Sequence, residues 1–258
     1  MRRRTPVSPV VLALAADAGR APARFARRAQ AGVRLVDCQY PVARVGGGMQ
    51  IKLVRHGQSL SNTGALRAHE VGDSGIALSP AGVAQAGAAG RTIGREFIAT
   101  SLVYCSPYMR TRQTTAEILR AVDAAGQTRV YEDPRLREVE RGYLDEASQH
   151  EARKIHGWFY YRHSGGESPA DCYDRTSAFL ESLMRQARRR DAAGALIVTH
   201  GMTIRCFVTR FLHLTVEQFE MLANPSNCDI ITIAPVAGLA APVFQCGRWG
   251  VEGIRLRP

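Results

Sequence analysis

Two histidines stand in matching positions of this sequence. His56 follows the hydrophobic run 51–54 and Arg55, His200 follows the hydrophobic run 195–199, and a glycine comes directly after each histidine. Ligands of open α/β sheets bind outside the carboxyl ends of the strands, where such a histidine projects, and each glycine is expected to let backbone and ligand approach closely. A neutral imidazole there can attack as a nucleophile or move a proton. The repeated context therefore favours a functional site over two isolated structural histidines.

The elements that must position these histidines follow from local patterns. Ser79-Pro80 and Ser168-Pro169 each combine a capping serine with a proline suited to the first position of a helix. Strands alternating with helices predict an α/β fold, a three-layer α/β/α sandwich whose mostly parallel sheet is covered on both faces. Strands are expected at 51–54, 102–105, 129–131, 195–199, 230–234 and 243–246, and helices at 79–93, 106–119, 168–190, 202–212 and 215–222.

Four short segments carry a resemblance to a known family. Each alone is a weak motif, but together, in this order over nearly all of 49–258, they resemble the histidine phosphatase superfamily, in its phosphoglycerate-mutase-like branch. Gly166-Glu167-Ser168 and Asn227-Cys228 resemble its small broad-specificity phosphatases. The four segments are Arg55-His56-Gly57-Gln58-Ser59 followed by Asn62, Ser106-Pro107-Tyr108-Met109-Arg110-Thr111-Arg112-Gln113-Thr114, Leu136-Arg137-Glu138, and Thr199-His200-Gly201.

The resemblance implies a role for each of these side chains. His56 is the expected nucleophile, Glu138 the proton donor and acceptor, and His200, as an imidazolium, the stabiliser of the transition state. A phosphate monoester is nearly dianionic, which suits the planar and permanently charged guanidinium fork of arginine. Nearby arginines also favour the neutral, nucleophilic form of His56. The substrate phosphate is expected to bind to Arg55, Asn62, Arg110 and Gly201.

The expected reaction is hydrolysis of a phosphomonoester through a phosphohistidine. The first alternative is a phosphoglycerate mutase of the same family. Such mutases carry a longer and more basic insert between proton donor and second histidine, whereas here only 61 residues separate Glu138 from His200. The second alternative is a non-catalytic phosphate-binding regulatory module, which the complete set of histidines, arginines and glutamate disfavours. Fold analogy gives the reaction class and leaves the physiological substrate open.

No metal and no cofactor are expected. His56, His200 and Glu138 could imitate an iron site of two histidines and one carboxylate, but the paired arginines disfavour a cation there.

The expected partner is a small phosphorylated substrate, and neither a nucleic acid nor a membrane is expected to bind. The protein itself is expected to be a monomer or a homodimer. Arg188-Arg189-Arg190 offset the dipole of a helix C-terminus, and no aromatic residues interleave with them as in a nucleic-acid patch. The apolar run 10–16 is far shorter than the roughly 20 residues of a membrane span.

The charge is unevenly distributed along the chain. The protein has 258 residues, 45% of them hydrophobic, and a formal net charge of +11, from 34 Lys and Arg against 23 Asp and Glu. Residues 1–48 hold nine arginines and two aspartates, a net of +7, which leaves 25 − 21 = +4 for residues 49–258.

The six cysteines form no C-x-x-C pair, which is typical of free thiols in a reducing compartment. A cytoplasmic location is expected.

Residues 1–48 form an extension rich in alanine and arginine with no sustained periodicity, for which little stable structure is expected. They loosely imitate a secretory signal, which Asp17 and Arg20 interrupt, or an organellar presequence, which is usually richer in serine. The interpretation favoured here is that translation begins at Met49, so that 1–48 is a mis-assigned start. The domain organisation is then a histidine phosphatase domain at 49–258.

Two other features have alternative interpretations. The aromatic run 158–161 is expected to form either a lid over the substrate or the packing face of a short helix. Arg137 and Arg141 flank Glu138 and could contact an acidic substrate, but surface pairing with Glu140 is the simpler expectation.

Overall fold

The computed structural model describes residues 48–142 and 146–257. The interpretations of the N-terminal extension and of its start site therefore lie outside the described residues, except for Gly48 itself. Among the helices that are described, none combines the length and the apolar composition that crossing a bilayer requires.

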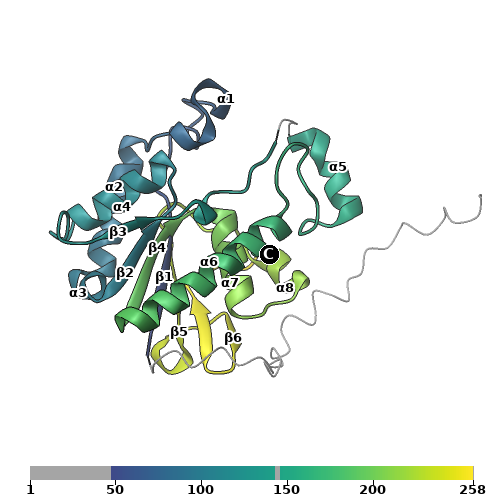
Figure 1. Ribbon diagram of the computed structural model, residues 1–258. Helices are drawn as coiled ribbons and strands as arrows, with labels where there is room; N and C mark the ends of the chain where they lie inside the picture. The colour runs from purple at the N-terminus through teal and green to yellow at the C-terminus, as the bar shows by residue number, and fades with distance from the viewer. Residues whose placement is uncertain (1–47, 143–145, 258) are drawn as a thin grey trace, which may run out of the picture. The chain divides into compact units, whose positions relative to one another are not determined.

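A single seven-stranded sheet with the order β3-β2-β4-β1-β5-β7-β6 forms the centre of the fold (Figure 1). β1 and β2 both pair parallel with β4, and β3 pairs parallel with β2. β5 runs antiparallel to β1, and β7 antiparallel to β5, so β1 to β4 and β7 share one direction. The expected mostly parallel sheet is confirmed. The strands are β1 (Gln50–Arg55), β2 (Ser101–Cys105), β3 (Val130–Glu132), β4 (Gly194–Thr199), β5 (Ile230–Pro235), β6 (Phe244–Cys246) and β7 (Trp249–Glu252).

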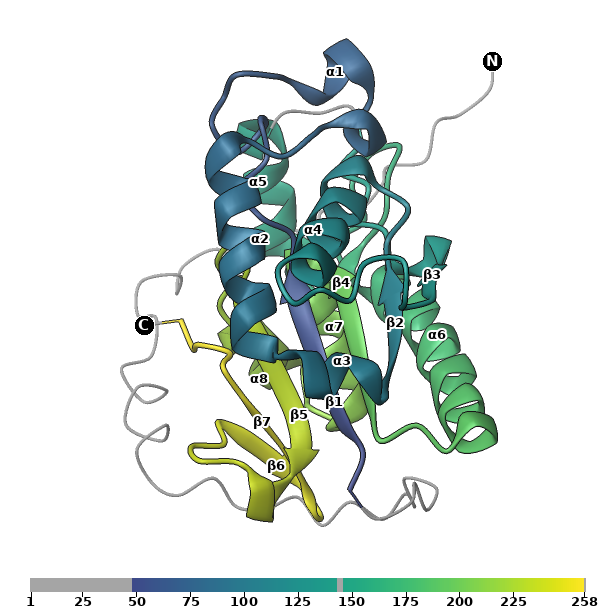
Figure 2. The same ribbon diagram turned by 90° about the vertical axis from the view of Figure 1, so that its left-hand side faces the viewer.

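Helices cover both faces of this sheet. On one face α2, α3 and α4 pack on side chains such as Val103 and Val198, and these three helices lie in front of the sheet in Figure 2. On the other face α6 and α7 pack on Ile51, Leu53 and Ile197. The helices are α1 (Ala68–Val71), α2 (Pro80–Ile93), α3 (Arg95–Ala99), α4 (Met109–Arg120), α5 (Glu146–His156), α6 (Pro169–Arg190), α7 (Gly201–Phe211) and α8 (Val216–Met221), with 3-10 turns η1 (Asp73–Gly75), η2 (Pro134–Leu136) and η3 (Val236–Gly238).

Burial and capping explain why the main elements form where they do. All six residues of β4 are buried, as expected for a central strand with helices on both sides. The Ser79 hydroxyl accepts a hydrogen bond from the Gly82 amide at the start of α2. Ser168 and Asp171 form a reciprocal capping box at the start of α6. Both serine-proline signals are thus confirmed as helix starts.

Four elements were not predicted from the sequence. β7 follows β6 after a tight turn at Gly247, which has a φ of 56°, and its short glycine-containing run hides the pattern of a strand. α1 and α3 each span at most five residues, too few to show a helical period. α5 is dominated by charged and polar side chains, so too few apolar residues mark its helical period.

Candidate active site

The register of two adjacent parallel strands brings the histidines together. Arg55 of β1 lies opposite Thr199 of β4, so each strand delivers its next residue, His56 or His200, to the same edge of the sheet. The His56 amide donates to the Thr199 carbonyl at 3.0 Å, and the two imidazole rings lie 5.2 Å apart at 61°. Both side chains are buried. The structure therefore places the two sequence-predicted histidines in contact.

The tautomer of His56 is fixed by the backbone carbonyl of the next residue, Gly57. Nδ1 lies 2.7 Å from the Gly57 carbonyl oxygen, which can only accept, so Nδ1 carries the hydrogen and Nε2 carries the lone pair. Burial, followed by the positive charge of Arg110, lowers the pKa of His56 to about 3, and Arg55 acts in the same direction. The imidazole is therefore neutral at physiological pH, with its nucleophilic nitrogen unprotonated.

His200 is held by a serine from the neighbouring strand end. Its Nε2 lies 2.9 Å from the Ser106 hydroxyl, and Tyr108 packs edge-on against its ring. Its Nδ1 is buried without a hydrogen-bond partner among the described residues. Burial first, then His56 and Arg110, lowers the pKa of His200 well below its usual value. This shift favours the neutral imidazole, and the imidazolium expected of His200 stays a prediction for the state with phosphate bound.

Arg110 lies in the first turn of α4 and is almost fully buried. Its guanidinium donates to both carboxylate oxygens of Asp73 at 3.0 and 3.1 Å, and to the Asp73 carbonyl at 2.6 Å. The aromatic face of Tyr108 lies 4.8 Å from the guanidinium carbon. Asp73, in the short turn η1, was not predicted, because a single acid in a glycine-containing loop carries no pattern. A carboxylate thus occupies the arginine fork that the sequence assigns to phosphate.

Arg55 and Asn62 are positioned by the segment that precedes β5. Arg55 donates to the Pro225 carbonyl at 2.6 Å, and its Nε is buried without a partner in the described part of the chain. Burial lowers the pKa of the Arg55 guanidinium, whereas Glu138 nearby raises it. Asn227 donates to the His56 carbonyl at 3.0 Å and to the Asn62 side-chain oxygen at 3.2 Å. Because the oxygen of Asn62 also accepts from the Ser59 amide, the amide nitrogen of Asn62 is the group left to donate to an anion.

Glu138 follows the turn η2 and is anchored to the start of α7. One carboxylate oxygen accepts from the Val139 amide at 3.0 Å, and the other from the Met202 amide at 3.4 Å. Two threonines beside His200 hold the same segment, because the Thr199 hydroxyl donates to the Leu136 carbonyl at 2.6 Å and the Thr203 hydroxyl donates to the Arg137 carbonyl at 2.7 Å. The proton donor proposed from the sequence is therefore tied to the strand and helix that carry the second histidine.

The two glycines are also required for packing, and the ligand approach expected of them stays a prediction. A Cβ on Gly57 would lie 2.4 Å from the Gly82 carbonyl oxygen in α2. A Cβ on Gly201 would lie 2.2 Å from the side-chain oxygen of Asn224. The Gly57 amide also donates to the Thr114 hydroxyl at 3.0 Å, which ties the His56 loop to α4 one turn after Arg110. Neither glycine could be replaced without moving backbone or a supporting side chain.

The arginine that precedes Glu138 has a different partner from the one expected. Arg137 pairs with Glu167 and not with Glu140, and Glu167 also receives two hydrogen bonds of 3.2 Å from Arg175. Glu167 belongs to the segment Gly166-Glu167-Ser168 that the resemblance had singled out. Residues 158–160 of the aromatic run form a turn and not a helix, Phe159 is buried with its ring centre 4.9 Å from that of Phe219, and Tyr160 is 63% exposed; the lid stays a prediction.

Solved structures of other proteins share this arrangement of elements. The native structure of a mycobacterial glucosyl-3-phosphoglycerate phosphatase superposes with a TM-score of 0.62 at 22% identity, covering 80% of this chain and 98% of that one. A crystal structure of a putative α-ribazole-5′-phosphate phosphatase from Escherichia coli gives 0.59 at 20% identity, covering 78% and 97%. These likenesses show the class of fold, an α/β sandwich built on a central sheet.

The chain belongs to the histidine phosphatase superfamily (branch 1), whose family model matches residues 51–240. The phosphoglycerate mutase-like protein AT74H of Arabidopsis thaliana is 36% identical over 202 residues, or 70% of this chain and 72% of that protein. The broad-range acid phosphatase DET1 of Saccharomyces cerevisiae is 33% identical over 115 residues, or 42% of this chain and 34% of that protein. The family and the fold expected from the sequence are therefore confirmed.

Proposed function

We propose that this protein hydrolyses a small phosphomonoester through a phosphohistidine formed on Nε2 of His56. The observation that supports this most directly is the environment of His56. The Gly57 carbonyl fixes its tautomer, and burial together with the positive charges of Arg110 and Arg55 lowers its pKa, which keeps the imidazole neutral. A nucleophile that must attack a dianion needs a free lone pair and a cationic surrounding, and this histidine has both.

The phosphate is bound by groups that already converge on His56. Arg55 and Arg110 neutralise the equatorial oxygens, Asn62 donates from its amide nitrogen, and the amide of Gly201 at the start of α7 donates to the same group. Two buried nitrogens of the site, Nδ1 of His200 and Nε of Arg55, have no hydrogen-bond partner in the described part of the chain. A bound dianion supplies the counter-charge that raises the pKa of His200, so that His200 donates a hydrogen bond as phosphate binds.

Two displacements complete the reaction. Nε2 of His56 attacks phosphorus while the bond to the ester oxygen breaks, and the carboxylic acid of Glu138 gives its proton to the departing alkoxide. The resulting carboxylate then removes a proton from water, whose oxygen attacks phosphorus and breaks the P–N bond. Inorganic phosphate leaves, and both His56 and Glu138 return to their initial states. No step uses a metal ion, and we infer that the activity is metal-independent.

A phosphoglycerate mutase is the alternative that the names of the relatives support, since AT74H is described as phosphoglycerate mutase-like. A mutase must keep its phosphoenzyme from water and bind a second phosphate. The connection between Glu138 and His200 is short, and it covers only residues 139–199. Arg137 and Arg175 are both paired with Glu167, so fewer basic groups remain for that second phosphate. We therefore favour hydrolysis, carried by a cytoplasmic catalytic domain at 49–258.

Turnover of p-nitrophenyl phosphate in the presence of EDTA tests this proposal. Purified wild-type protein is expected to release p-nitrophenol between pH 5 and 8, and His56→Ala to lose the activity almost completely. No turnover by a folded wild-type protein would contradict the hydrolase. Conversion of 3-phosphoglycerate that depends on added bisphosphate would instead establish the mutase, and phosphate binding without either reaction would establish the regulatory module.

A further inference from the structure

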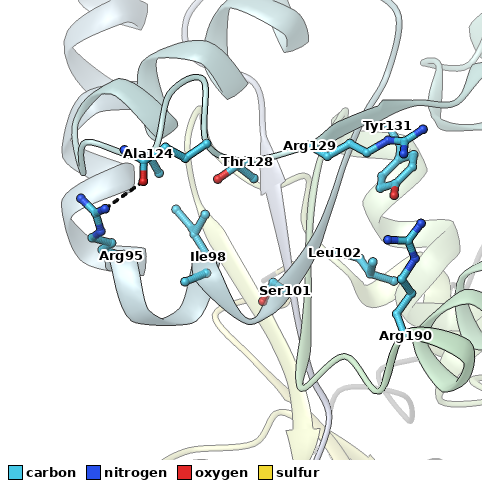
Figure 3. Close-up of a pocket in the computed structure, with 11 residues that line it drawn as sticks. Arg95, Ile98, Ser101, Leu102, Ala124, Thr128, Arg129, Tyr131 and Arg190 are labelled. Atoms are coloured by element: carbon cyan, nitrogen blue, oxygen red, sulfur yellow. Dashed lines mark hydrogen bonds between the residues drawn. The ribbon is translucent and has the colours of Figure 1, made fainter.

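A second basic pocket lies at the opposite end of the sheet from the histidines. β2 leads towards the catalytic edge, where Ser106 contacts His200, whereas Ser101 and Leu102 at its beginning line a cavity of about 310 Å³. α6 likewise starts at the capping Ser168 and ends at Arg190, which lines the same cavity (Figure 3). This volume is near the lower end of the range for pockets that bind small molecules.

Positive charge dominates the lining of this pocket. Arg95 from α3, Arg129 before β3 and Arg190 from α6 all line it, and none of the lining residues is an aspartate or a glutamate. Arg95 donates only to neutral groups, the Asp123 carbonyl at 3.1 Å and the Gln127 side-chain oxygen at 3.0 Å. Neither Arg129 nor Arg190 forms an ion pair with any residue of the described chain.

Arg129 and Arg190 both lie beside Tyr131 at one end of the cavity. The guanidinium of Arg129 lies 4.9 Å from the centre of the Tyr131 ring, and Arg190 extends towards the same ring (Figure 3). The apolar side chain of Leu102 lies beside Arg190, that of Ile98 lies on the side of the cavity nearer Arg95, and both are buried (Figure 3). The pocket thus has a cationic end beside an apolar floor, which is an arrangement that fits an anion carrying a hydrocarbon or ring portion.

The dipole of α6 accounts for only part of this charge. Three consecutive arginines end the helix, and cations there offset the dipole. Arg188 and Arg189 meet that need without lining the pocket, whereas Arg95 and Arg129 come from other elements and have no helix end of their own to neutralise. Convergence of three separate segments on one cavity is therefore the feature that calls for a ligand.

We propose that this pocket binds a small organic phosphate or phosphonate, with the anionic head between Arg129 and Arg190 and the apolar part on Ile98 and Leu102. Guanidinium groups that lack carboxylate partners are suited to bind such a head through charge-assisted hydrogen bonds. The site is separate from the catalytic histidines, so its occupancy does not require turnover.

Calorimetric titration of the full chain with phenylphosphonate, which has a dianionic head, a ring and no hydrolysable ester bond, tests the proposal. Wild type is expected to bind two molecules, one at each end of the sheet. Arg129→Gln combined with Arg190→Gln should weaken one site at least about tenfold, as expected when charge-assisted hydrogen bonds are lost, and should leave p-nitrophenyl phosphate turnover within about twofold of wild type. Methylphosphonate, which lacks the ring, should bind this site more weakly.

Two further variants make the result specific. Arg188→Gln combined with Arg189→Gln removes the same charge from the same helix end and should keep both sites. Arg55→Gln should weaken the catalytic site and keep the distant one, so failure of the catalytic proposal is seen separately from failure of this one. Equal binding by wild type and the Arg129/Arg190 variant, or a single wild-type site that Arg55→Gln weakens and the Arg129/Arg190 variant keeps, would overturn the proposal.

Discussion

Arg110 and Asp73 form a bidentate ion pair at the candidate active site. Two parallel hydrogen bonds of 3.0 and 3.1 Å join the guanidinium to the carboxylate, and the arginine is almost fully buried while the aspartate is more than one-third exposed. The same fork is the one assigned to the substrate phosphate. Under the proposed function, phosphate and Asp73 compete for Nη1 and Nη2 of Arg110.

Removing this competitor should strengthen phosphate binding. Asp73→Asn keeps the shape of the side chain and removes its charge, so Arg110 no longer has to exchange a carboxylate for phosphate. We expect inorganic phosphate to inhibit turnover about three- to tenfold more strongly, in keeping with the net value of about 1 kcal/mol for a hydrogen-bonded pair. The inhibition constant measured against p-nitrophenyl phosphate gives this directly.

The matched control for this variant is Glu132→Gln. Glu132 is paired with Arg112, an exposed arginine of the helix α4 that also carries Arg110. Glu132→Gln should leave phosphate inhibition unchanged. Weaker inhibition in Asp73→Asn would mean that Asp73 supports Arg110 in the liganded state instead of competing with phosphate.

The buried neutral histidine makes stability depend on pH. The pKa of His56 is lowered to about 3 in the folded protein, against about 6.5 in an unfolded chain. Between these values the unfolded state binds a proton that the folded state does not, so stability is complete above about pH 6.5 and falls as the pH falls towards 3. His56 alone should cost about 2 kcal/mol between pH 7.5 and pH 5, and His200 acts in the same direction.

Urea unfolding at the two pH values measures this dependence. His56→Gln should reduce the difference between them, whatever its effect at a single pH, because glutamine does not titrate. Saturating phosphate should also reduce the wild-type difference, since a bound dianion favours protonated histidine. The same pH dependence in wild type and His56→Gln would show that His56 is not the group responsible.

Gly57 tests the close contact between the catalytic loop and α2. Gly57→Ala would place its Cβ 2.4 Å from the Gly82 carbonyl oxygen, so loop or helix backbone must move. We expect a loss of about 1–3 kcal/mol in the free energy of unfolding, as for other overpacked positions, together with reduced turnover because His56 shifts. Gly238→Ala is the control, because a Cβ there meets no atom within 4 Å. Equal stability of the two variants would contradict the packing role of Gly57.

The pairing of His56 with His200 could be predicted because each histidine is marked by the residues directly beside it in the sequence. Each histidine ends a hydrophobic strand, and strands that alternate with helices form a parallel sheet, so both side chains reach one edge. The resemblance to a family added Arg110 and Glu138, which no periodicity marks.

The partners of those residues could not be predicted, because they depend on contacts between distant loops. Asp73 reaches Arg110 across 37 positions, and Glu167 reaches Arg137 across 30. The lowered pKa of His200 likewise depends on contacts made in the fold: burial and the neighbouring His56 and Arg110 cause it, and none of these is visible in the motif Thr199-His200-Gly201.

Glu138 offers the sharpest test of the chemical mechanism, because its two tasks fall in different steps. The acid is needed in the first step only when the leaving group is basic, whereas its conjugate base is needed in the second step for every substrate. Glu138→Gln should therefore slow hydrolysis of an alkyl phosphate such as β-glycerophosphate by about 10²–10⁴-fold at its first step. With p-nitrophenyl phosphate the first step should stay fast, and the phosphoenzyme should accumulate.

Rapid mixing with p-nitrophenyl phosphate would show this accumulation as a burst of p-nitrophenol close to one equivalent of enzyme, followed by a slow steady state. Acid-labile phosphate bound to the protein should appear on the same time scale, and His56→Ala combined with Glu138→Gln should show neither. Glu140→Gln is the control, since this exposed carboxylate lies two residues away and should leave both steps at the wild-type rate. Equal slowing of both substrates without a burst would remove Glu138 from the role of proton donor, because an acid that assists the leaving group must distinguish a basic alkoxide from p-nitrophenolate.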